Sequence, residues 1–528
     1  MNLEIPNDAT ASSDAVTAIN HVTFEYQTDE DDTPDLAVTG VKNINLEFPP
    51  GSCTLVTGPS GSGKSTLLKL LNGLIPELFS GKLEGDVRLG GLDTVGTDIQ
   101  QLGRAAGTVF QNPRSQFFTA TVYQELAFAC ENAGDAPAVI RQRLEQVARI
   151  WGIEPLLECK LKQLSGGEQQ LVASAIALMS PQRIVLLDEP TSNLSPEAID
   201  GFVAVLAGLK REGWTVVVAE HRLYPLRGLA DRVVVMRDGT VVTDQPAAEF
   251  FASSDTRRRE LGLRILTPPQ QHCFKETRVD VTDVPIHEGA TQETPVRAIS
   301  GKIVSGSGVV AENLRFSYGK TRILDIPRLE VPAGAVTALT GANGAGKTTL
   351  ARTLIGLAHP EKDAHIYFNG QRCRSHQRTK RSVLVMQDVN RQLFGESVLG
   401  EVTLGNTEVS VGQAREILTE LGLGGLEERH PMTLSGGQKQ RLVIANAIAG
   451  NAELYVFDEP TSGVDYGHLM SISRLIRRLA VAGKAVLVIS HDWEFLNEVT
   501  DRELRLSPLR EVTDRGQIQV FGAATAQR

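Results

Sequence analysis

The sequence predicts an α/β protein made of two copies of one domain, each built on a mostly parallel β-sheet. The chain repeats a set of short segments in the same order in its two halves. Each half also contains apolar runs without polar alternation, which are typical of strands buried on both faces of a parallel sheet. With 528 residues the chain is long enough for two such domains.

The repeat keeps its register over much of each half. Three pairs of residues are each 270 positions apart: Ser165 and Ser435, Asp188 and Asp458, and His221 and His491. Lys64 and Lys347 are 283 positions apart, so the second copy is shorter only in the stretches between the lysine and the serine. Unrelated domains with similar loops would not keep such a register, so we expect two homologous domains.

Composition indicates where the domains begin and end. We expect a polar tail over residues 1–16, a first domain over 17–252, a linker over 253–308 and a second domain over 309–528. The linker is rich in proline, glycine and mixed charge. A short helix near residues 256–263 would still fit against the first domain.

Bulk properties argue against several classes of protein. A net charge of −10 disfavours a nucleic-acid binder, which needs a basic face. No run approaches the ~18 apolar residues of a membrane span, and the N-terminus lacks the basic start and apolar core of a secretory signal. The five cysteines form no CxxC pair, which favours free thiols in a reducing compartment. We expect a cytoplasmic protein whose contact with a membrane goes through a partner.

Each half carries a glycine-rich loop between an expected strand and an expected helix. GPSGSGKST and GANGAGKTT match the pattern GxxxxGKS/T, in which backbone amides and a helix start bind phosphate oxygens. We expect Lys64 and Lys347 to reach the β and γ phosphates, and Ser65 and Thr348 to ligate Mg²⁺. The nucleotide-binding residues expected in the two loops are Gly58, Pro59, Ser60, Gly61, Ser62, Gly63, Lys64, Ser65 and Thr66, and Gly341, Ala342, Asn343, Gly344, Ala345, Gly346, Lys347, Thr348 and Thr349.

Two adjacent acids end an apolar strand in each half. Asp188 and Asp458 are expected to hold the Mg²⁺ shell. Glu189 and Glu459 follow them and are candidate general bases for the attacking water. A solvated pair of acids at a strand end is the plainer alternative. It is disfavoured because both pairs follow a glycine loop at a similar distance.

A histidine and a glutamine are expected to complete each site. His221 and His491 each lie 32 residues after their glutamate, and we expect them to donate to a γ-phosphate oxygen. A lone histidine at a strand end is more often structural, but the matched spacing favours function. Gln111 and Gln387 end short apolar strands, where an amide is expected to contact the metal shell and the attacking water.

An aromatic side chain precedes each glycine loop. Tyr26 and Tyr318 lie in strand-like runs, and we expect them to stack on the adenine of a nucleotide. An ordinary strand aromatic is the alternative.

The segments LSGGE at Leu164 and LSGGQ at Leu434 resemble the signature of ABC ATPases. The glutamines, the segments SNLS and SGVD after DEPT, and the final histidines carry the same resemblance, which covers nearly the whole chain except its linker and ends. It implies two P-loop NTPase domains, each with a mostly parallel core sheet, an antiparallel β subdomain and a helical signature subdomain. It also implies ATP and Mg²⁺ as cofactors and ATP hydrolysis as the activity.

The resemblance explains why one chain carries two signatures. In ABC ATPases two domains face each other head to tail, and each ATP lies between the glycine loop of one domain and the signature of the other. ATP then closes the pair and hydrolysis releases it. The signature residues carried over are Ser435, Gly436 and Gly437 for the first glycine loop, and Ser165, Gly166 and Gly167 for the second.

The segments after the two glutamines indicate a subgroup. QNPRSQFFTATVYQEL and QDVNRQLFGESVLGEV align without a gap and look like the ATPase subunits of energy-coupling-factor transporters, which import vitamins or transition-metal ions. This resemblance implies a membrane scaffold protein, a separate substrate-capture membrane protein, and a peripheral place at the cytoplasmic face of the cell membrane. The residues expected to contact the scaffold are Phe118, Val122, Glu125, Phe394, Val398 and Glu401.

In that interpretation the aromatic and aliphatic side chains form a groove for a helix, and the acid binds an arginine on it. Internal packing of the helical subdomain is the alternative for these six positions.

Two rival functions also remain: the tandem ATPase of a sugar-type ABC importer, and a ribosome-associated ABC translation factor, which would be expected to carry a long basic linker. A purely structural or nucleotide-sensing role is disfavoured because both lysines and both glutamates are kept. These residues do not name the transported substrate.

The first half departs from the family pattern at two positions. Leu171 stands where the second half has Arg441, and Ser195 stands where it has Asp465. By resemblance, both departures bear on the site built on the second glycine loop, because first-half signature elements face it. We therefore predict that the site of Glu459 hydrolyses ATP more slowly than the first site.

Exchanging each candidate base in turn tests this asymmetry. Glu189→Gln should lower the steady-state ATPase rate of the full chain more than Glu459→Gln, because the first site carries more of the turnover. Phosphate release at saturating ATP measures both variants. A larger loss in the Glu459→Gln variant would show that the asymmetry is absent or reversed.

Overall fold

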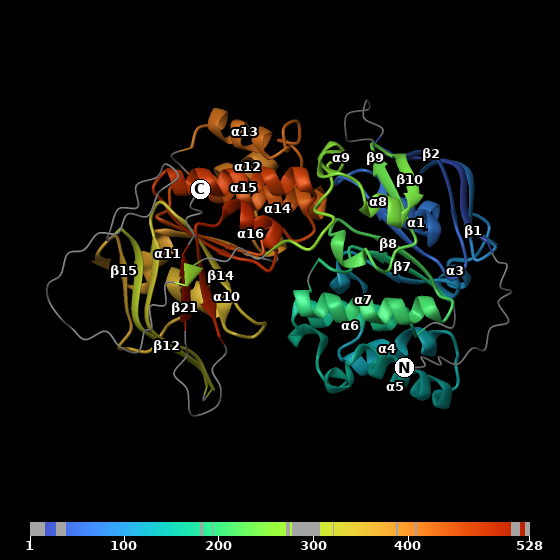
Figure 1. Cartoon of the computed structure of the whole chain (residues 1–528), viewed down its shortest axis with the longest axis horizontal. Coiled ribbons are helices and arrows are strands. Elements are labelled where there is room, and N and C mark those ends of the chain that lie inside the picture. Colours follow the sequence, from blue (N-terminus) through green and yellow to red (C-terminus); the bar gives the residue numbers. More distant parts are fainter. Residues whose placement is uncertain are drawn as a thin grey trace. The chain divides into compact units, whose positions relative to one another are not determined.

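The computed structural model describes residues 16–27, 38–179, 183–192, 194–270, 275–276, 307–319, 321–386, 389–406, 409–507 and 518–522. The chain divides into two compact units, with the division along the sequence between Pro268 and Pro269. Each unit contains a mostly parallel core sheet, a four-stranded antiparallel sheet and a group of helices (Figure 1). This confirms the predicted fold class for both halves.

The core sheet of the first unit has six strands in the order β10-β9-β3-β8-β7-β6. Only β10 and β9 pair antiparallel among these neighbours. β3 and β8 are buried at every position, as their unbroken apolar runs predict. The strands are β3 (Cys53–Thr57), β6 (Gly107–Val109), β7 (Ile184–Asp188), β8 (Thr215–Ala219), β9 (Arg232–Arg237) and β10 (Thr240–Pro246).

The antiparallel sheet of the first unit has the order β2-β1-β4-β5. Its inner face packs with the leucines of α1 in one apolar cluster. The strands are β1 (Thr17–Tyr26), β2 (Val38–Phe48), β4 (Gly81–Leu89) and β5 (Leu92–Asp93).

The helices α4, α5 and α6 of the first unit pack on one another and form its helical subdomain (Figure 1). α5 also packs on α7 through Trp151 and Phe202, whose ring centroids lie 5.1 Å apart. The α-helices are α1 (Lys64–Leu71), α2 (Leu74–Glu77), α3 (Ile99–Ala105), α4 (Val122–Asn132), α5 (Pro137–Trp151), α6 (Gly166–Ala177), α7 (Pro196–Arg211), α8 (Ala247–Phe251) and α9 (Asp255–Glu260). Short 3₁₀ turns are η1 (Pro113–Gln116), η2 (Glu154–Leu156), η3 (Leu161–Gln163) and η4 (Tyr224–Leu226).

The first unit extends beyond residue 252, where the sequence suggested that a linker begins. α9 overlaps the stretch near residues 256–263 where a short helix is expected. Leu261, Leu263 and Leu266 are buried in the same apolar cluster as α7. Burying these leucines removes apolar surface from water, which is favourable and holds the segment on the first unit as far as the proline pair at 268 and 269.

The second unit repeats this architecture with one more core strand. Its core sheet has the order β11-β21-β20-β14-β19-β18-β17, and its antiparallel sheet has the order β13-β12-β15-β16. The core strands are β11 (Lys275–Glu276), β14 (Val336–Thr340), β17 (Ser382–Val385), β18 (Leu454–Asp458), β19 (Ala485–Ile489), β20 (Arg502–Leu506) and β21 (Ile518–Gly522). The antiparallel strands are β12 (Gly308–Tyr318), β13 (Thr321–Pro332), β15 (His365–Phe368) and β16 (Gln371–Arg372).

The helices of the second unit follow the order of the first. α12, α13 and α14 pack together as its helical subdomain. The helices are α10 (Lys347–Ile355), α11 (Ser375–Lys380), α12 (Val398–Thr403), α13 (Val411–Glu420), α14 (Gly436–Ala449), α15 (Tyr466–Val481) and α16 (Trp493–Val499), with 3₁₀ turns η5 (Val389–Arg391) and η6 (Pro431–Thr433).

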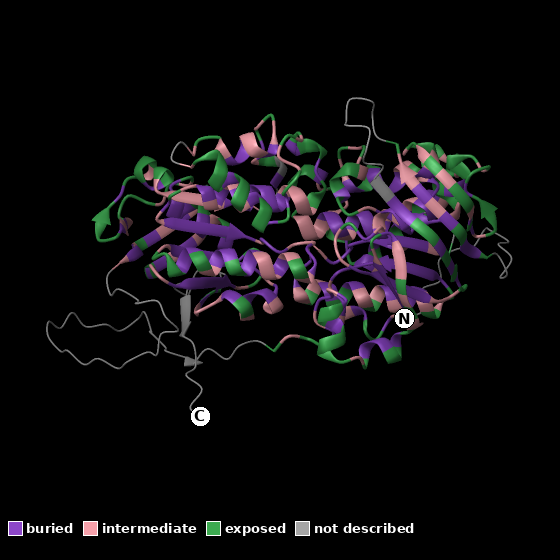
Figure 2. Ribbon diagram, turned by 90° about the horizontal axis from the view of Figure 1, so that it is seen from above, coloured by how far each residue is buried: buried purple, intermediate pink, exposed green. Residues whose placement is uncertain are grey.

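Burial follows the sheets: buried residues run along the core strands, and exposed residues lie on the outward faces of the helices (Figure 2). Within the described part of the chain, no helix combines the length and the apolar character that crossing a membrane requires. Four cysteines are free thiols, and Cys273 lies outside the described residues.

Two leucines in the first unit offer a matched test of this core. Leu206 of α7 is buried in the main apolar cluster, whereas Leu78 is exposed. Leu206→Ala should lower the free energy of unfolding by ~2–5 kcal/mol, and Leu78→Ala by no more than ~0.5 kcal/mol. Urea unfolding in a Trp493→Phe background measures this, because the two remaining tryptophans, Trp151 and Trp214, then report on the first unit alone. Equal losses in the two variants would contradict the assigned core.

Candidate active sites

The glycine-rich loop of the first unit joins β3 to α1 and has a shape that only glycine permits at its start. Gly58 has a φ of +148°, and a Cβ there would lie 2.0 Å from the carbonyl oxygen of Met236. α1 begins at Lys64 after the left-handed Gly63, without a side-chain cap on its first amides. Such a helix start is suited to bind an anion.

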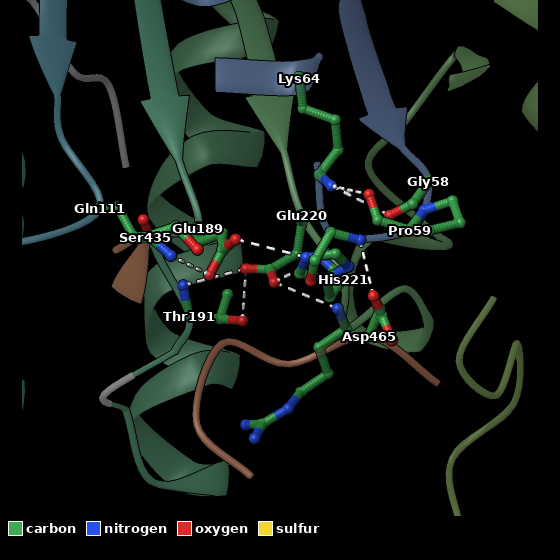
Figure 3. Close-up of polar contacts among 12 residues, drawn as sticks. Gly58, Pro59, Lys64, Gln111, Glu189, Thr191, Glu220, His221, Ser435 and Asp465 are labelled. Carbon is green, nitrogen blue, oxygen red and sulfur yellow. Dashed lines mark hydrogen bonds and ion pairs between the residues drawn. The ribbon is translucent and has the colours of Figure 1, made fainter. Parts of the chain in front are cut away.

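Lys64 lies over this loop. Its Nζ donates hydrogen bonds to the carbonyl oxygens of Gly58 and Pro59, at 3.0 and 2.9 Å (Figure 3). Burial lowers the pKa of Lys64, and the charges of Glu189 and Asp188 act against that shift. The ammonium group is therefore held at the loop where a phosphate would bind.

The glycine loop of the second unit has the same geometry. A Cβ on Gly341 would lie 2.1 Å from the carbonyl oxygen of Leu506. Lys347 begins α10, and its Nζ donates to the carbonyl oxygens of Gly341 and Ala342, at 2.7 and 3.0 Å. The sequence repeat thus corresponds to a repeat of local structure.

An aspartate at the end of a core strand lies beside the hydroxyl that follows each lysine. Thr348 Oγ1 donates to Asp458 Oδ2 at 3.0 Å, and the hydroxyl of Ser65 in the first unit acts to lower the pKa of Asp188. Asp188 Oδ1 is buried and has no hydrogen-bond partner among the described residues. Because buried oxygens are normally satisfied, this orphaned atom and its neighbouring hydroxyl fit a bound Mg²⁺.

Mg²⁺ would take few ligands from the protein itself. The described residues contain no group of three or more His, Cys, Asp or Glu side chains that could hold a metal ion. Mg²⁺ commonly binds through one or two protein oxygens together with substrate phosphates and water.

Burial raises the pKa of Asp188 to about 7, and the charge of Glu189 adds to the shift. Burial also raises the pKa of Asp458.

Glu189 is held by two side chains from neighbouring strand ends. Gln111 Nε2 donates to its Oε2 at 2.9 Å, and His221 Nε2 lies 3.4 Å from its Oε1 (Figure 3). Burial alone would raise the pKa of Glu189, but the hydrogen bonds from His221 and Gln111 and the charge of Lys64 together lower it. An ionised carboxylate held in this way is suited to accept a proton from water.

The corresponding glutamate of the second unit is held differently. Ser490 Oγ donates to Glu459 Oε2 at 3.0 Å. His491 Nε2 lies 4.0 Å from Glu459 Oε1, and its side chain is 22% exposed, compared with 5% for His221. Both glutamates have positive φ angles, +47° for Glu189 and +51° for Glu459. Gln387 lies outside the described residues.

Each signature serine begins a helix. Ser165 caps α6 in a capping box with Glu168, and Ser435 caps α14 in a capping box with Gln438. Their following glycines, Gly166 and Gly167 in α6 and Gly436 and Gly437 in α14, form the first turns and carry the unpaired amides of a helix start.

The two tyrosines expected to stack on adenine lie in different surroundings. Tyr26 donates or accepts a hydrogen bond with Thr66 Oγ1 at 3.0 Å, and its ring packs edge to face on Phe24 and Phe79. Burial raises the pKa of Tyr26. Tyr318 is exposed. Stacking on adenine stays a prediction for both.

The two first-half residues that depart from the family pattern, Leu171 and Ser195, take part in packing and helix capping within the first unit. Leu171 packs against the core of the first unit, whereas Arg441 is buried in the second. Ser195 caps α7 by accepting a hydrogen bond from the backbone N–H of Ala198 at 3.3 Å. The serine–proline pair at 195 and 196 signals such a cap, because serine suits the N-cap and proline the first helical position.

The structure corrects part of the expected partner surface in the first unit. Val122 is fully buried, and the buried carboxylate of Glu125 accepts hydrogen bonds from the backbone N–H groups of Phe118 and Thr119 and from the Thr119 hydroxyl, at 2.7–3.1 Å. Glu125 is therefore not placed to bind an arginine of a partner. Its carboxylate instead shapes the loop that carries Phe118, which is 74% exposed.

The second unit repeats this correction. Val398 is fully buried, and Glu401 accepts hydrogen bonds from the backbone N–H groups of Phe394 and Gly395, at 2.7 and 2.6 Å, and from Asn446 Nδ2 at 3.2 Å. Phe394 is 76% exposed. Of the six expected contact residues, the two phenylalanines alone are presented at the surface.

A cavity of about 380 Å³ lies beside Phe118 in the first unit. Phe118 stacks on Phe128 of α4, with ring centroids 5.5 Å apart. The wall also includes Leu102 of α3, Phe110 after β6 and Ile176 of α6. The cavity is therefore an apolar groove between the helical subdomain and the core sheet, and we call it the Phe118 groove.

One buried acid in the first site was missed by the sequence reasoning. Glu220 lies directly before His221 and forms hydrogen bonds with Thr191, His221 and Arg222. The signal was the difference between VVVAEH and VLVISH, which places Ser490 at the corresponding position.

Comparisons with known proteins match both halves. The sequence profile of the ABC transporter family matches residues 41–192 and 324–462. A candidate ABC transporter ATP-binding protein of Treponema denticola is 38% identical over 465 residues, covering 88% of this chain and 91% of that protein. Another of Methanosarcina acetivorans is 32% identical over 542 residues, covering 96% of this chain and 86% of that protein.

Among solved structures, the chain is similar in fold to an RNase-L inhibitor, with a TM-score of 0.56 and 23% identity over 92% of this chain and 94% of that one. A model of ribosome-bound archaeal Pelota and ABCE1 gives a TM-score of 0.60 with 23% identity, over 92% of this chain and 82% of that one. These solved structures share the fold, and the sequence profile and the two relatives show the family. The chain belongs to the ABC transporter ATP-binding proteins, as a tandem ATPase with one ATP-hydrolysing domain in each half.

Proposed function

We propose that this tandem ATPase powers a membrane importer of the energy-coupling-factor type, for vitamins or transition-metal ions. The Phe118 groove is the observation that carries the proposal. An apolar groove beside an exposed aromatic side chain is a common binding site for an amphipathic helix of a partner. A membrane scaffold protein would supply that helix from its cytoplasmic side, and a separate capture protein would choose the substrate.

The two exposed phenylalanines support a partner that meets both halves. Phe118 and Phe394 occupy equivalent positions, and each lies in a loop that a buried glutamate organises through backbone N–H groups. A phenylalanine left exposed lacks the stabilisation of about 1.5–3 kcal/mol that burying its side chain would contribute. Two such exposures at matched positions favour a binding role over internal packing.

Within this proposal, ATP joins the two halves of the chain. Each nucleotide, with Mg²⁺, would lie between the glycine loop of one half and the signature helix start of the other, Ser435–Gly437 for the first loop and Ser165–Gly167 for the second. Glu189 and Glu459 would accept the proton of the attacking water, and His221 and His491 would contact the γ-phosphate. Closure on ATP and release after hydrolysis would then move the helical subdomains that carry the partner contacts.

Different observations favour the importer and the alternative functions. The similarity to ribosome-bound ABCE1 favours a translation factor at the level of the fold. A net charge of −10 and relatives described as candidate transporter subunits favour transport. A sugar-type importer ATPase would share the ATP sites and differ in its partner. In the importer proposal, the chain binds its membrane partner from the cytoplasmic face of the membrane and is a peripheral protein.

Removing the two phenylalanines tests the partner surface. A Phe118→Ala/Phe394→Ala chain should lose co-purification with a membrane scaffold from detergent-solubilised membranes, because it no longer presents the aromatic contacts. Mass spectrometry of proteins captured with the tagged full-length chain measures this.

A matched control is Leu78→Ala, which removes an exposed apolar side chain elsewhere on the first unit and should keep the scaffold. Circular dichroism verifies that both variants are folded. Capture of ribosomes in place of membrane proteins by the unaltered chain would sink the importer proposal and favour the translation factor.

A further inference from the structure

Glu220 is a buried acid that the ATPase motifs of the two halves do not share. It follows β8 directly and precedes His221, and the equivalent residue of the second unit is Ser490. Its side chain is almost completely buried. A charge at such a place is costly unless it is well hydrogen-bonded, so its partners indicate its role.

Both carboxylate oxygens of Glu220 are occupied. Oε2 accepts hydrogen bonds from the backbone N–H of Thr191, at 3.1 Å, and from the Thr191 hydroxyl, at 2.7 Å. Oε1 accepts from the backbone N–H groups of His221 and Arg222, at 2.8 and 3.1 Å (Figure 3). Hydrogen bonds to an ionised group are roughly twice as strong as neutral ones. Glu220 thus joins the loop after Glu189 to the backbone of the histidine.

The second unit makes the same connection with other residues. Thr461, the equivalent of Thr191, donates to Asp492 Oδ2 at 3.1 Å. Asp492 follows His491 and takes the position that Arg222 has in the first unit. Ser490 Oγ donates to Glu459 and accepts the backbone N–H of Asp492 at 3.1 Å. The histidine segment is therefore Glu-His-Arg in the first unit and Ser-His-Asp in the second.

The two arrangements hold the histidine differently. His221 Nε2 lies 3.4 Å from Glu189 Oε1, whereas the corresponding distance for His491 and Glu459 is 4.0 Å. In the first unit no serine follows β8 to bind the candidate base, and a carboxylate fixes the backbone of the histidine itself.

We propose that Glu220 is a positioning residue for ATP hydrolysis in the first unit. It fixes the backbone of His221 and the loop at Thr191, so that His221 stays against Glu189 without the serine contact that the second unit uses. Glu220 acts through the histidine and the loop, and it does not itself touch the reacting groups. Its loss should therefore lower kcat and leave the KM for ATP nearly unchanged.

The test measures kcat and KM for ATP in the full-length chain, both unaltered at Glu459 and carrying Glu459→Gln. In the Glu459→Gln chain, whose turnover comes from the first site, Glu220→Ser should lower kcat by about ten-fold or more, because a misplaced base forfeits part of the ~10²–10⁴-fold that acid–base catalysis contributes. The KM should change by less than about two-fold.

The double variant Glu220→Ser/Arg222→Asp rebuilds the Ser-His-Asp arrangement of the second unit. It should recover most of the kcat that Glu220→Ser loses, which general loss of structure would not allow. Circular dichroism and thermal unfolding monitor the fold, and Glu220→Gln serves as a milder variant that keeps the shape of the side chain.

Three results would overturn the proposal. The first is a kcat within about two-fold of the parent for Glu220→Ser in the Glu459→Gln background. The second is a rise in KM as large as the fall in kcat. The third is a double variant as inactive as the single one, since the rebuilt contacts would then have no positioning effect.

Discussion

Two adjacent carboxylates at the end of one core strand are the constraint around which each half of this protein is organised, and in the first half both are buried. Asp188 ends β7 and Glu189 follows it, and burial alone would raise the pKa of both. Leaving two buried acids without partners is costly. The first unit therefore brings a lysine, a glutamine and a histidine close to them, and one oxygen of Asp188 has no hydrogen-bond partner among the described residues.

The parallel sheet is what makes this gathering possible. β7 pairs with β6 and β8, and β8 pairs with β3, so the carboxyl ends of all four strands meet at one edge. Gln111 follows β6, His221 follows β8, and the loop to Lys64 follows β3. Residues far apart in the sequence become neighbours because each lies in the segment that follows a strand of this sheet, where ligand sites in such sheets are found.

The repeated segments made much of this predictable from the sequence. Apolar runs located the core strands, the glycine pattern located α1 and α10, and the signature serines located the starts of α6 and α14. Side-chain direction was not predictable in the same way. Glu125 and Glu401 align in a segment that suggested a partner surface, yet each turns inward to backbone N–H groups of its own loop. A pattern of residue types gives no sign of that choice, since a carboxylate accepts equally from an amide or an arginine.

Hydrogen bonds of this kind, between side chains and nearby backbone N–H groups, are found along the segment from the catalytic edge of the sheet to the protein surface. In the first unit, Gln111 Nε2 donates to Glu189, and Gln116, the last residue of η1, accepts the backbone N–H of Phe110 at 3.0 Å. Glu125 then fixes the backbone at Phe118. The stretch from Gln111 to Phe118 is thus bonded at its start, middle and end. Side-chain hydrogen bonds therefore fix the backbone between the contact with Glu189 and the exposed ring of Phe118.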